Sequence, residues 1–205
     1  MNIGIIDCRL GNIHSISKCI INLGFKNDII KKPEDLIDCN KIIFPGVGSF
    51  SKAMEIITND GWIPYLNKKI IEEKTKFLGI CLGMQILADE GLEIKKCNGL
   101  GFISGSVISL DELGCKETIP HIGWNNVEIK RKNVLFDNIV NNSDFYFNHS
   151  FAMKCNDESN IIGTTDHQIN VVASINKGNI FGTQFHPEKS FSAGQKILKN
   201  FLELE

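Results

Sequence analysis

Apolar and polar positions alternate in a regular way along the first part of the chain. Ile3–Ile6 is a short apolar run of strand length, and residues 12–24 then place isoleucines and leucine broadly at helical spacing until Gly24 ends the pattern. Residues 27–30 and 42–44 are two further apolar runs. Short strands that alternate with amphipathic helices predict βαβ units around a parallel sheet.

The second part of the chain has a different pattern. Helical spacing continues through residues 49–57 and 63–73, but residues 101–129 and 145–151 consist of β-favouring runs separated by glycine turns. An amphipathic helix is predicted at residues 195–202, close to the end of the sequence. We therefore expect one domain over residues 1–205, with an α/β fold: a mostly parallel central sheet, helices on both faces and an antiparallel extension.

Composition narrows the possible functions. The 205 residues carry a net charge of −2, which does not suggest a surface for nucleic acid or membrane. No apolar run approaches the roughly 18–20 residues of a membrane span, and the first residues lack the features of a signal peptide, so we expect a cytoplasmic protein. The seven cysteines show no Cys-x-x-Cys pair, so we expect free thiols and no metal site.

One cysteine lies where chemistry is expected. Cys81 stands between Gly79 and Gly83, at the point where an apolar run of strand type changes to a helical pattern. A tight strand-turn-helix corner requires small neighbours and exposes the central residue near a helix amino end, which favours a thiolate. Gln85 lies four residues on, on the same helix face. The alternative is a buried structural cysteine, since free cysteine is among the most buried residue types.

A base for such a nucleophile is available far downstream. His186 precedes Pro187, which should end a strand, and Glu188 follows two residues later. A thiol needs a base, and the base needs a partner that fixes its tautomer, so Cys81, His186 and Glu188 can form a triad. His14, His121 and His149 compete for the role of base, but none of them has this strand-end position with a carboxylate two residues on.

Six segments of the sequence, taken together, resemble one known family. They are residues 7–15 (DCRLGNIHS), 45–50 (PGVGSF), 79–85 (GICLGMQ), 120–125 (PHIGWN), 146–151 (YFNHSF) and 184–189 (QFHPEK). Their order and content resemble the class I, triad-type glutamine amidotransferases, and in particular the glutaminase subunits of imidazole glycerol phosphate synthase. The resemblance extends from about residue 3 to residue 201.

The resemblance implies a function and a set of roles. The expected reaction is hydrolysis of glutamine to glutamate and ammonia, without metal or cofactor, and the expected partner is a (βα)8-barrel cyclase that forms a heterodimer with this chain and consumes the ammonia in histidine biosynthesis. The implied catalytic residues are Cys81, His186 and Glu188; the implied oxyanion and substrate-binding residues are Val47, Gly48, Leu82, Gln85, His149 and Ser150; the implied partner-facing residues are Asn12, Pro120, Trp124 and Lys189.

Several alternatives stay open at this stage. Asn148 stands where the family usually has valine and Phe151 where it usually has tyrosine, and the turn at residues 8–10 also departs from the usual pattern, so a paralogue that feeds ammonia to a sugar-amidating enzyme of surface polysaccharide synthesis is a second interpretation. Others are a non-catalytic subunit that only binds a partner, and a free-standing cysteine hydrolase. Without the resemblance, residues 45–48 are also compatible with a plain Pro-Gly turn, residues 9–12 with an ordinary βα loop, and Trp124 with a core aromatic residue.

Overall fold

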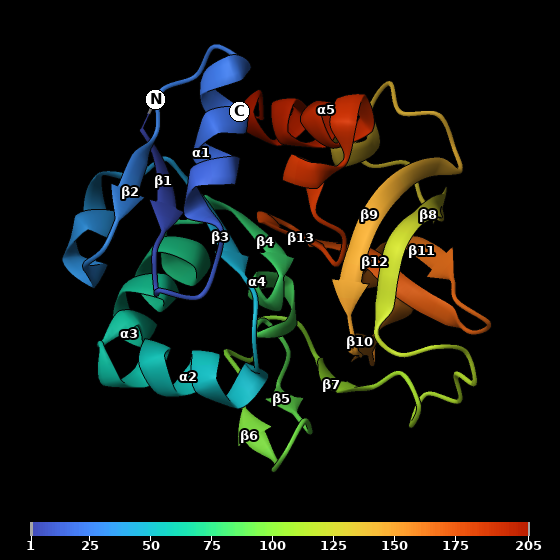
Figure 1. The fold of residues 1–205 in the computed structure, drawn as a ribbon. Coiled ribbons are helices and arrows are strands. Elements are labelled where there is room, and N and C mark those ends of the chain that lie inside the picture. Colours follow the sequence, from blue (N-terminus) through green and yellow to red (C-terminus); the bar gives the residue numbers. More distant parts are fainter. Residues whose placement is uncertain (1, 205) are drawn as a thin grey trace.

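The computed structural model describes residues 2–204, and a nine-stranded sheet runs through the whole of it (Figure 1). The strand order is β2-β1-β3-β4-β13-β12-β11-β8-β9. Neighbours from β2 to β13 are parallel, and neighbours from β13 to β9 are antiparallel. The strands are β1 (Ile3–Ile6), β2 (Asp28–Ile30), β3 (Lys41–Gly46), β4 (Lys76–Cys81), β8 (His121–Ile129), β9 (Ser143–His149), β11 (Ile161–Asp166), β12 (Asn170–Lys177) and β13 (Ile180–Thr183).

Helices cover both faces of the parallel half of the sheet (Figure 1). On one face, α1 (Ile13–Asn22) and α5 (Phe191–Leu202) pack their buried isoleucines and leucines and Phe201 onto the strands. On the other face lie α2 (Phe50–Asn59), α3 (Trp62–Leu66) and the π-helical turn Asn67–Glu72 that continues it. The predicted α/β fold, with a parallel centre, helices on both faces and an antiparallel extension, is confirmed.

The antiparallel region is divided between two sheets. Four of its strands extend the main sheet, while a separate four-stranded sheet has the order β10-β7-β5-β6. The chain leaves β9 at His149 and enters β10 at Phe151, so a single residue, Ser150, links these strands of the two sheets. The strands of the second sheet are β5 (Glu90–Gly91), β6 (Cys97–Asn98), β7 (Gly105–Ser109) and β10 (Phe151–Cys155).

Two boundaries differ from the sequence prediction in ways that affect the site. Pro45 and Gly46 belong to β3, because they continue its parallel pairing with Ile80 and Cys81 of β4. The helix after Cys81 is only α4 (Leu82–Gln85), since the carbonyl groups of residues 86–88 accept hydrogen bonds from the backbone of residues 100–103 instead. As a result β3 extends as far as Cys81 of β4, and the chain after Cys81 leaves the helix after one turn.

These strand ends determine where chemistry can occur. β3, β4 and β13 are parallel neighbours, so their carboxyl ends meet at one edge of the sheet. Gly46, Cys81 and the segment 184–188 that follows β13 therefore lie together at that edge. In residues 2–204, no helix has the length and apolar character that crossing a membrane would require.

Candidate active site

Cys81 occupies a strained corner at the end of β4. Its backbone has φ 54° and ψ −111°, a region that non-glycine residues rarely adopt. The corner is closed by backbone contact: a Cβ atom on Gly79 would lie 2.3 Å from the carbonyl oxygen of Gly83, and one on Gly83 would lie 1.8 Å from that of Phe44. Glycine at both positions is therefore a steric requirement of the corner that holds the sulfur.

His186 and Glu188 form a buried pair beside this corner. His186 Nδ1 lies 2.9 Å from Glu188 Oε1, and both side chains are 4% exposed. Burial by itself would lower the pKa of His186, but interactions with the Cys81 sulfur and the Glu188 carboxylate outweigh it and raise that pKa to about 9. The imidazole therefore carries its proton at neutral pH.

The other nitrogen of His186 faces the thiol side. Among the described residues, His186 Nε2 is buried and has no hydrogen-bond partner, although the sulfur is close enough to influence the charge of the ring. Glu188 thus fixes one ring nitrogen and leaves the second available for proton transfer. The sequence-predicted triad residues are brought together in this structure.

Ser190, which the sequence analysis did not single out, holds the turn that carries His186. Its hydroxyl donates to the carbonyl oxygen of His186 at 2.6 Å and accepts from the N–H of Tyr146 at 3.0 Å. The N–H of His186 in turn donates to the carbonyl oxygen of Tyr146 at 2.9 Å. This turn is thereby fixed to β9. No local pattern marks Ser190, because its partner Tyr146 lies 44 residues away.

A cavity of about 260 Å³ opens next to Cys81. It contains all six of the predicted oxyanion and substrate-binding residues, together with one carboxylate that the sequence analysis missed, Glu93. Glu93 Oε2 accepts a hydrogen bond from the N–H of Phe50 at 2.7 Å, at the start of α2. Glu93 and Phe50 are 43 residues apart, so no local sequence pattern marks this contact. The lining residues are Val47, Gly48, Cys81, Leu82, Gln85, Glu93, Pro120, Asn148, His149, Ser150 and Phe151.

Two glutamine side chains connect the thiol to the cavity wall. Gln184 Nε2 lies 3.5 Å from the Cys81 sulfur, and Gln184 Oε1 accepts from Gln85 Nε2 at 3.0 Å. Gln85 Nε2 also donates to the carbonyl oxygen of Phe151 at 2.9 Å. The sulfur itself lies 3.9 Å from the carbonyl oxygen of Asn148. The segment 148–151 is thus connected to Cys81 both directly and through the two amides.

The peptide of Val47 has an orientation that matters for an oxyanion. Its N–H donates to the carbonyl oxygen of Leu10, in the turn after β1. A Cβ atom on Gly11 would lie 3.0 Å from the carbonyl oxygen of Pro45, so the two turns are in close contact. In this conformation the Val47 N–H is hydrogen-bonded to Leu10, so it is not available to an oxyanion that forms on a substrate attacked by Cys81.

The four residues implied as partner-facing occupy different positions. Pro120 lies at the rim of the cavity, whereas Asn12, Trp124 and Lys189 do not line it. Asn12 is exposed and caps α1 by accepting from the N–H of Ser15. Trp124 is 46% exposed and stacks on Phe191, and Lys189 Nζ lies 5.2 Å from the ring centre of Tyr146. Trp124 is therefore a surface residue and not a core aromatic.

The structure holds no arrangement of metal ligands within residues 2–204: no three side chains of histidine, cysteine, aspartate or glutamate are placed to share an ion. All seven cysteines are free thiols. The side chains at the site that can serve as nucleophile, base and orienting carboxylate are Cys81, His186 and Glu188, with amide groups around them.

Comparison with family models agrees with this geometry. The model of the class-I glutamine amidotransferases matches residues 4–204, almost the whole chain. The chain belongs to this family.

Within the family, the chain is similar to proteins of one particular kind. It is 45% identical to imidazole glycerol phosphate synthase subunit HisH 1 of Campylobacter jejuni, over 98% of this chain and 100% of the relative. It is 46% identical to imidazole glycerol phosphate synthase subunit HisH of Methanocaldococcus jannaschii, over 98% and 99%.

Solved structures share the fold at lower identity. The structure of PurLQS from Thermotoga maritima matches with a TM-score of 0.77 and 18% identity, over 98% of this chain and 97% of the other. A glutamine amidotransferase from the same organism matches with a TM-score of 0.70 and 17% identity, over 99% and 96%.

Proposed function

We propose that this protein is the glutaminase subunit of an imidazole glycerol phosphate synthase and acts as a single amidotransferase domain. The observation that carries the proposal is the buried His186–Glu188 pair beside Cys81, with a cavity next to the sulfur. The similarity to HisH subunits supports the choice of glutamine as the substrate. The triad residues are those expected from the sequence.

The proposed reaction begins with attack of the Cys81 thiolate on the side-chain amide carbon of glutamine. The tetrahedral intermediate collapses with cleavage of the C–N bond, and His186 gives its proton to the leaving nitrogen, so that ammonia departs and a γ-glutamyl thioester remains. Water, deprotonated by His186, then attacks the thioester. The C–S bond breaks, glutamate leaves and the Cys81 thiolate is restored. Glu188 orients the His186 ring and stabilises its imidazolium form before ammonia leaves and again after water is deprotonated.

The cavity offers groups for the rest of the substrate. Glu93 contributes the only carboxylate among the lining residues, and a carboxylate is a suitable partner for the α-ammonium group of glutamine. Gln85 uses its amide nitrogen for Phe151 and Gln184, so its oxygen is the atom left for a ligand. We expect Glu93→Gln to raise KM by about tenfold or more while kcat changes little, since the lost contact is made equally in the ground state and the transition state.

A partner that receives the ammonia completes the proposal. Ammonia released into water is protonated and lost as a nucleophile, so a glutaminase of this kind should dock onto the synthase that uses its product. The proposed partner is a (βα)8-barrel cyclase, which carries the lyase step, and both proteins would work in the cytoplasm. The docking face would include Asn12, Pro120, Trp124 and Lys189.

The bond from Val47 to Leu10 supports a resting state of the isolated chain. An oxyanion needs N–H donors, and one missing donor costs roughly 10²–10³ in kcat. Docking at the turn of residues 9–12 would release the Val47 peptide, because this turn holds its N–H. The partner would then switch the glutaminase on.

The test is ammonia release by the purified chain alone, and by the chain mixed with the cyclase and an analogue of the cyclase substrate. We expect the partner to raise kcat by roughly 10²–10³. Full activity in the isolated chain, unchanged by the cyclase, would contradict the switch. Activation by a sugar-amidating enzyme and not by the cyclase would assign the chain to the paralogous function, for which the departures at Asn148 and Phe151 in the cavity wall would be relevant.

A further inference from the structure

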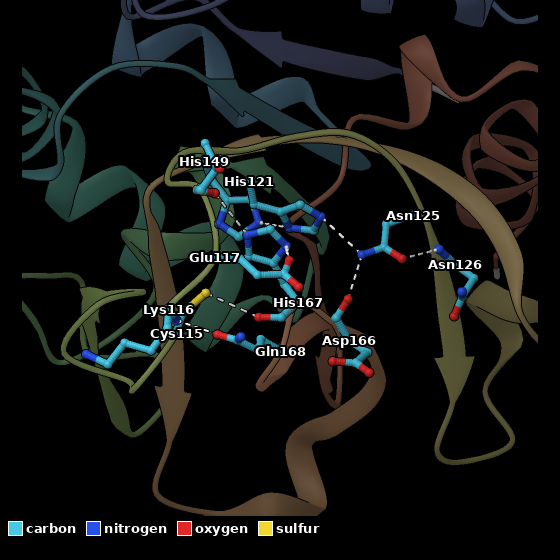
Figure 2. Close-up of polar contacts among 11 residues, drawn as sticks. Cys115, Lys116, Glu117, His121, Asn125, Asn126, His149, Asp166, His167 and Gln168 are labelled. Carbon is cyan, nitrogen blue, oxygen red and sulfur yellow. Dashed lines mark hydrogen bonds and ion pairs between the residues drawn. The ribbon is translucent and has the colours of Figure 1, made fainter.

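A second group of histidines lies apart from His186, and Figure 2 shows its polar contacts. His121 of β8 and His149 of β9 are directly paired neighbours in the sheet, and both are buried. His121 Nδ1 lies 3.2 Å from His149 Nε2 (Figure 2). His149 lines the cavity beside Cys81, whereas the proposed glutaminase mechanism gives His121 no function.

The hydrogen bonds around the pair allow only one arrangement of protons if both rings are neutral. The carbonyl oxygen of Phe151, 2.8 Å from His149 Nδ1, can only accept, so His149 Nδ1 carries a hydrogen. His149 Nε2 must then accept, and His121 Nδ1 must donate to it. His121 Nε2 in turn accepts from Asn125 Nδ2 at 3.2 Å. Both imidazoles are thus expected in the Nδ1–H form.

The hydrogen bonds form a series from Asn125 through His121 and His149 to the carbonyl oxygen of Phe151, and Asn125 is its outer end. Its Nδ2 also donates to the carbonyl oxygen of Asp166 at 2.7 Å, and its Oδ1 accepts from the N–H of Asn126 at 2.8 Å (Figure 2). All donors and acceptors from Asn125 to Phe151 therefore have partners with matching roles. The orientation of each side chain depends on the next.

The surroundings of the pair keep both rings uncharged. Burial, with a smaller contribution from charge on the neighbouring histidines, lowers the pKa of His149 to about 3 and that of His121 to about 4. The titratable groups that face the pair are His167, which stacks on His121 with ring centres 4.1 Å apart, and His186 beyond His149. Glu117 lies 3.3 Å from His167 Nδ1 and so faces the outer ring of the stack.

The inner end of the series reaches Cys81. The carbonyl oxygen of Phe151 accepts from both His149 Nδ1 and Gln85 Nε2, and Gln85 is joined through Gln184 to the sulfur. We infer that His121 is a positioning residue for the proposed glutaminase reaction: through His149 and the Phe151 carbonyl it holds the Gln85–Gln184 amides against the Cys81 sulfur. This inference rests on the proposed function only for its consequence on turnover; the geometry is independent of it.

The first test measures the tautomers in the full chain. Long-range ¹H–¹⁵N correlation spectra, assigned with His121→Phe and His149→Phe, distinguish the Nδ1–H form from the Nε2–H form. We expect Nδ1–H for both residues at pH 7 in the wild-type protein. An Nε2–H form of His149, or a protonated ring at either position, would overturn the proposal.

The second test measures the effect on the sulfur. In His121→Phe the ring between Phe147 and His167 is kept, but both of its hydrogen bonds are lost. We expect alkylation of Cys81 by iodoacetamide, followed by mass spectrometry, to slow by about threefold to tenfold, and kcat of the complex with the cyclase to fall by a similar factor, on the scale of one hydrogen bond.

Two further variants separate positioning from packing. His121→Asn keeps a donor near the position of Nδ1, so we expect it to recover most of the alkylation rate. His167→Phe is the matched control, since it makes the same change in the ring stacked on His121 but lies outside the hydrogen-bonded series, and it should behave as the wild type. Equal alkylation in His121→Phe and the wild type, or no recovery in His121→Asn, would overturn the positioning role. If the wild-type complex shows no glutaminase activity, the proposed function is rejected, and the alkylation rates alone decide whether His121 positions the amides.

Discussion

Two histidine arrangements flank Cys81, and they have opposite charge behaviour although they are almost equally buried. His186, His121 and His149 are 3%, 4% and 6% exposed. The pKa of His186 is raised to about 9, whereas those of His121 and His149 are lowered to about 4 and about 3. The difference comes from the partners: His186 faces a carboxylate and a thiol, and the other two face each other, an amide and a carbonyl. Burial disfavours the charged form of each ring to a similar extent, and the interactions with its partners determine whether the charged form is nevertheless favoured.

The same comparison separates two kinds of work. A ring that holds a proton next to a sulfur, with one nitrogen free, can transfer that proton. A ring whose two nitrogens are both bonded and uncharged can only fix the orientation of its neighbours. The experiments that follow break one arrangement at a time, from the largest expected effect to the smallest.

Removing the proton-transferring side should have the largest effect. His186→Ala and Cys81→Ala are expected to lower kcat for glutamine by about 10⁶, the scale observed when a hydrolase loses its nucleophile or base. Circular dichroism and thermal unfolding should show an intact fold. An electrophilic glutamine analogue should label Cys81 in the wild type, and equal labelling of Cys19 or Cys155 would contradict the assignment of the nucleophile.

Neutralising the partner of His186 should have a smaller effect. Glu188→Gln keeps the shape of the side chain but removes the charge that favours the imidazolium, so we expect kcat to fall by up to about 10⁴. The loss should be less than in His186→Ala, because the base itself remains. Wild-type kcat in Glu188→Gln would reduce the triad to a Cys81–His186 dyad.

Changing the positioning side where it meets the sulfur should have a still smaller effect. Gln184→Met has similar volume but lacks the N–H that lies 3.5 Å from the Cys81 sulfur. We expect alkylation of Cys81 and kcat to fall by about tenfold, since the hydrogen bond that orients the sulfur and favours its thiolate form is lost. A loss as large as that of His186→Ala would contradict the division of work between the two sides.

The smallest effect concerns stability and pH. The raised pKa of His186 contributes stability that is fully present below its ordinary value of 6.5 and is lost as pH rises through about 9. His121 and His149 have lowered pKa values, so the unfolded chain binds protons first and stability falls as pH drops from 6.5 towards about 4 and about 3. Each group changes the free energy of unfolding by at most about 1.4 kcal/mol per pH unit.

Urea unfolding at pH 4.5, 6.5 and 8.5 measures the loss of unfolding free energy on both the acidic and the basic side of pH 6.5. His186→Ala should weaken the loss of stability between pH 6.5 and 8.5, and His121→Phe should weaken the loss between 6.5 and 4.5. Identical pH profiles in the wild type and both variants would contradict the opposite pKa shifts.

Much of the fold, and the grouping of Cys81, His186 and Glu188 at one edge of the sheet, could be predicted from the sequence because the signals are local. The apolar run that ends at Cys81 between two glycines, and the strand that ends before His186-Pro187, both mark strand ends in a few residues. Glu93 and Ser190 could not be found in this way. Glu93 accepts a hydrogen bond from the first N–H of α2, and Ser190 accepts one from Tyr146 of a different element.

The pairing of His121 with His149 was also beyond sequence reasoning. In the sequence each histidine is a separate candidate, as a competing base or a substrate-side residue, while their contact depends on the register of β8 against β9 across 28 residues. Register of an antiparallel pair is set by the whole pattern of buried side chains and by the connection between the strands, not by any single motif.

The glycine contacts around Cys81 limit how such an enzyme can be redesigned. At Gly79 and Gly83 the backbone of the corner that holds Cys81 lies directly against other backbone atoms. Neither position tolerates an added side-chain atom, so substitution there cannot adjust the geometry of the corner. The opposite wall is different, because residues 148–151 present side chains to the cavity. Variant libraries that aim at a new amide substrate should therefore keep the corner at residues 79–83 constant and vary residues 148–151. A recombined enzyme should take residues 79–83 and Phe44 from the same parent.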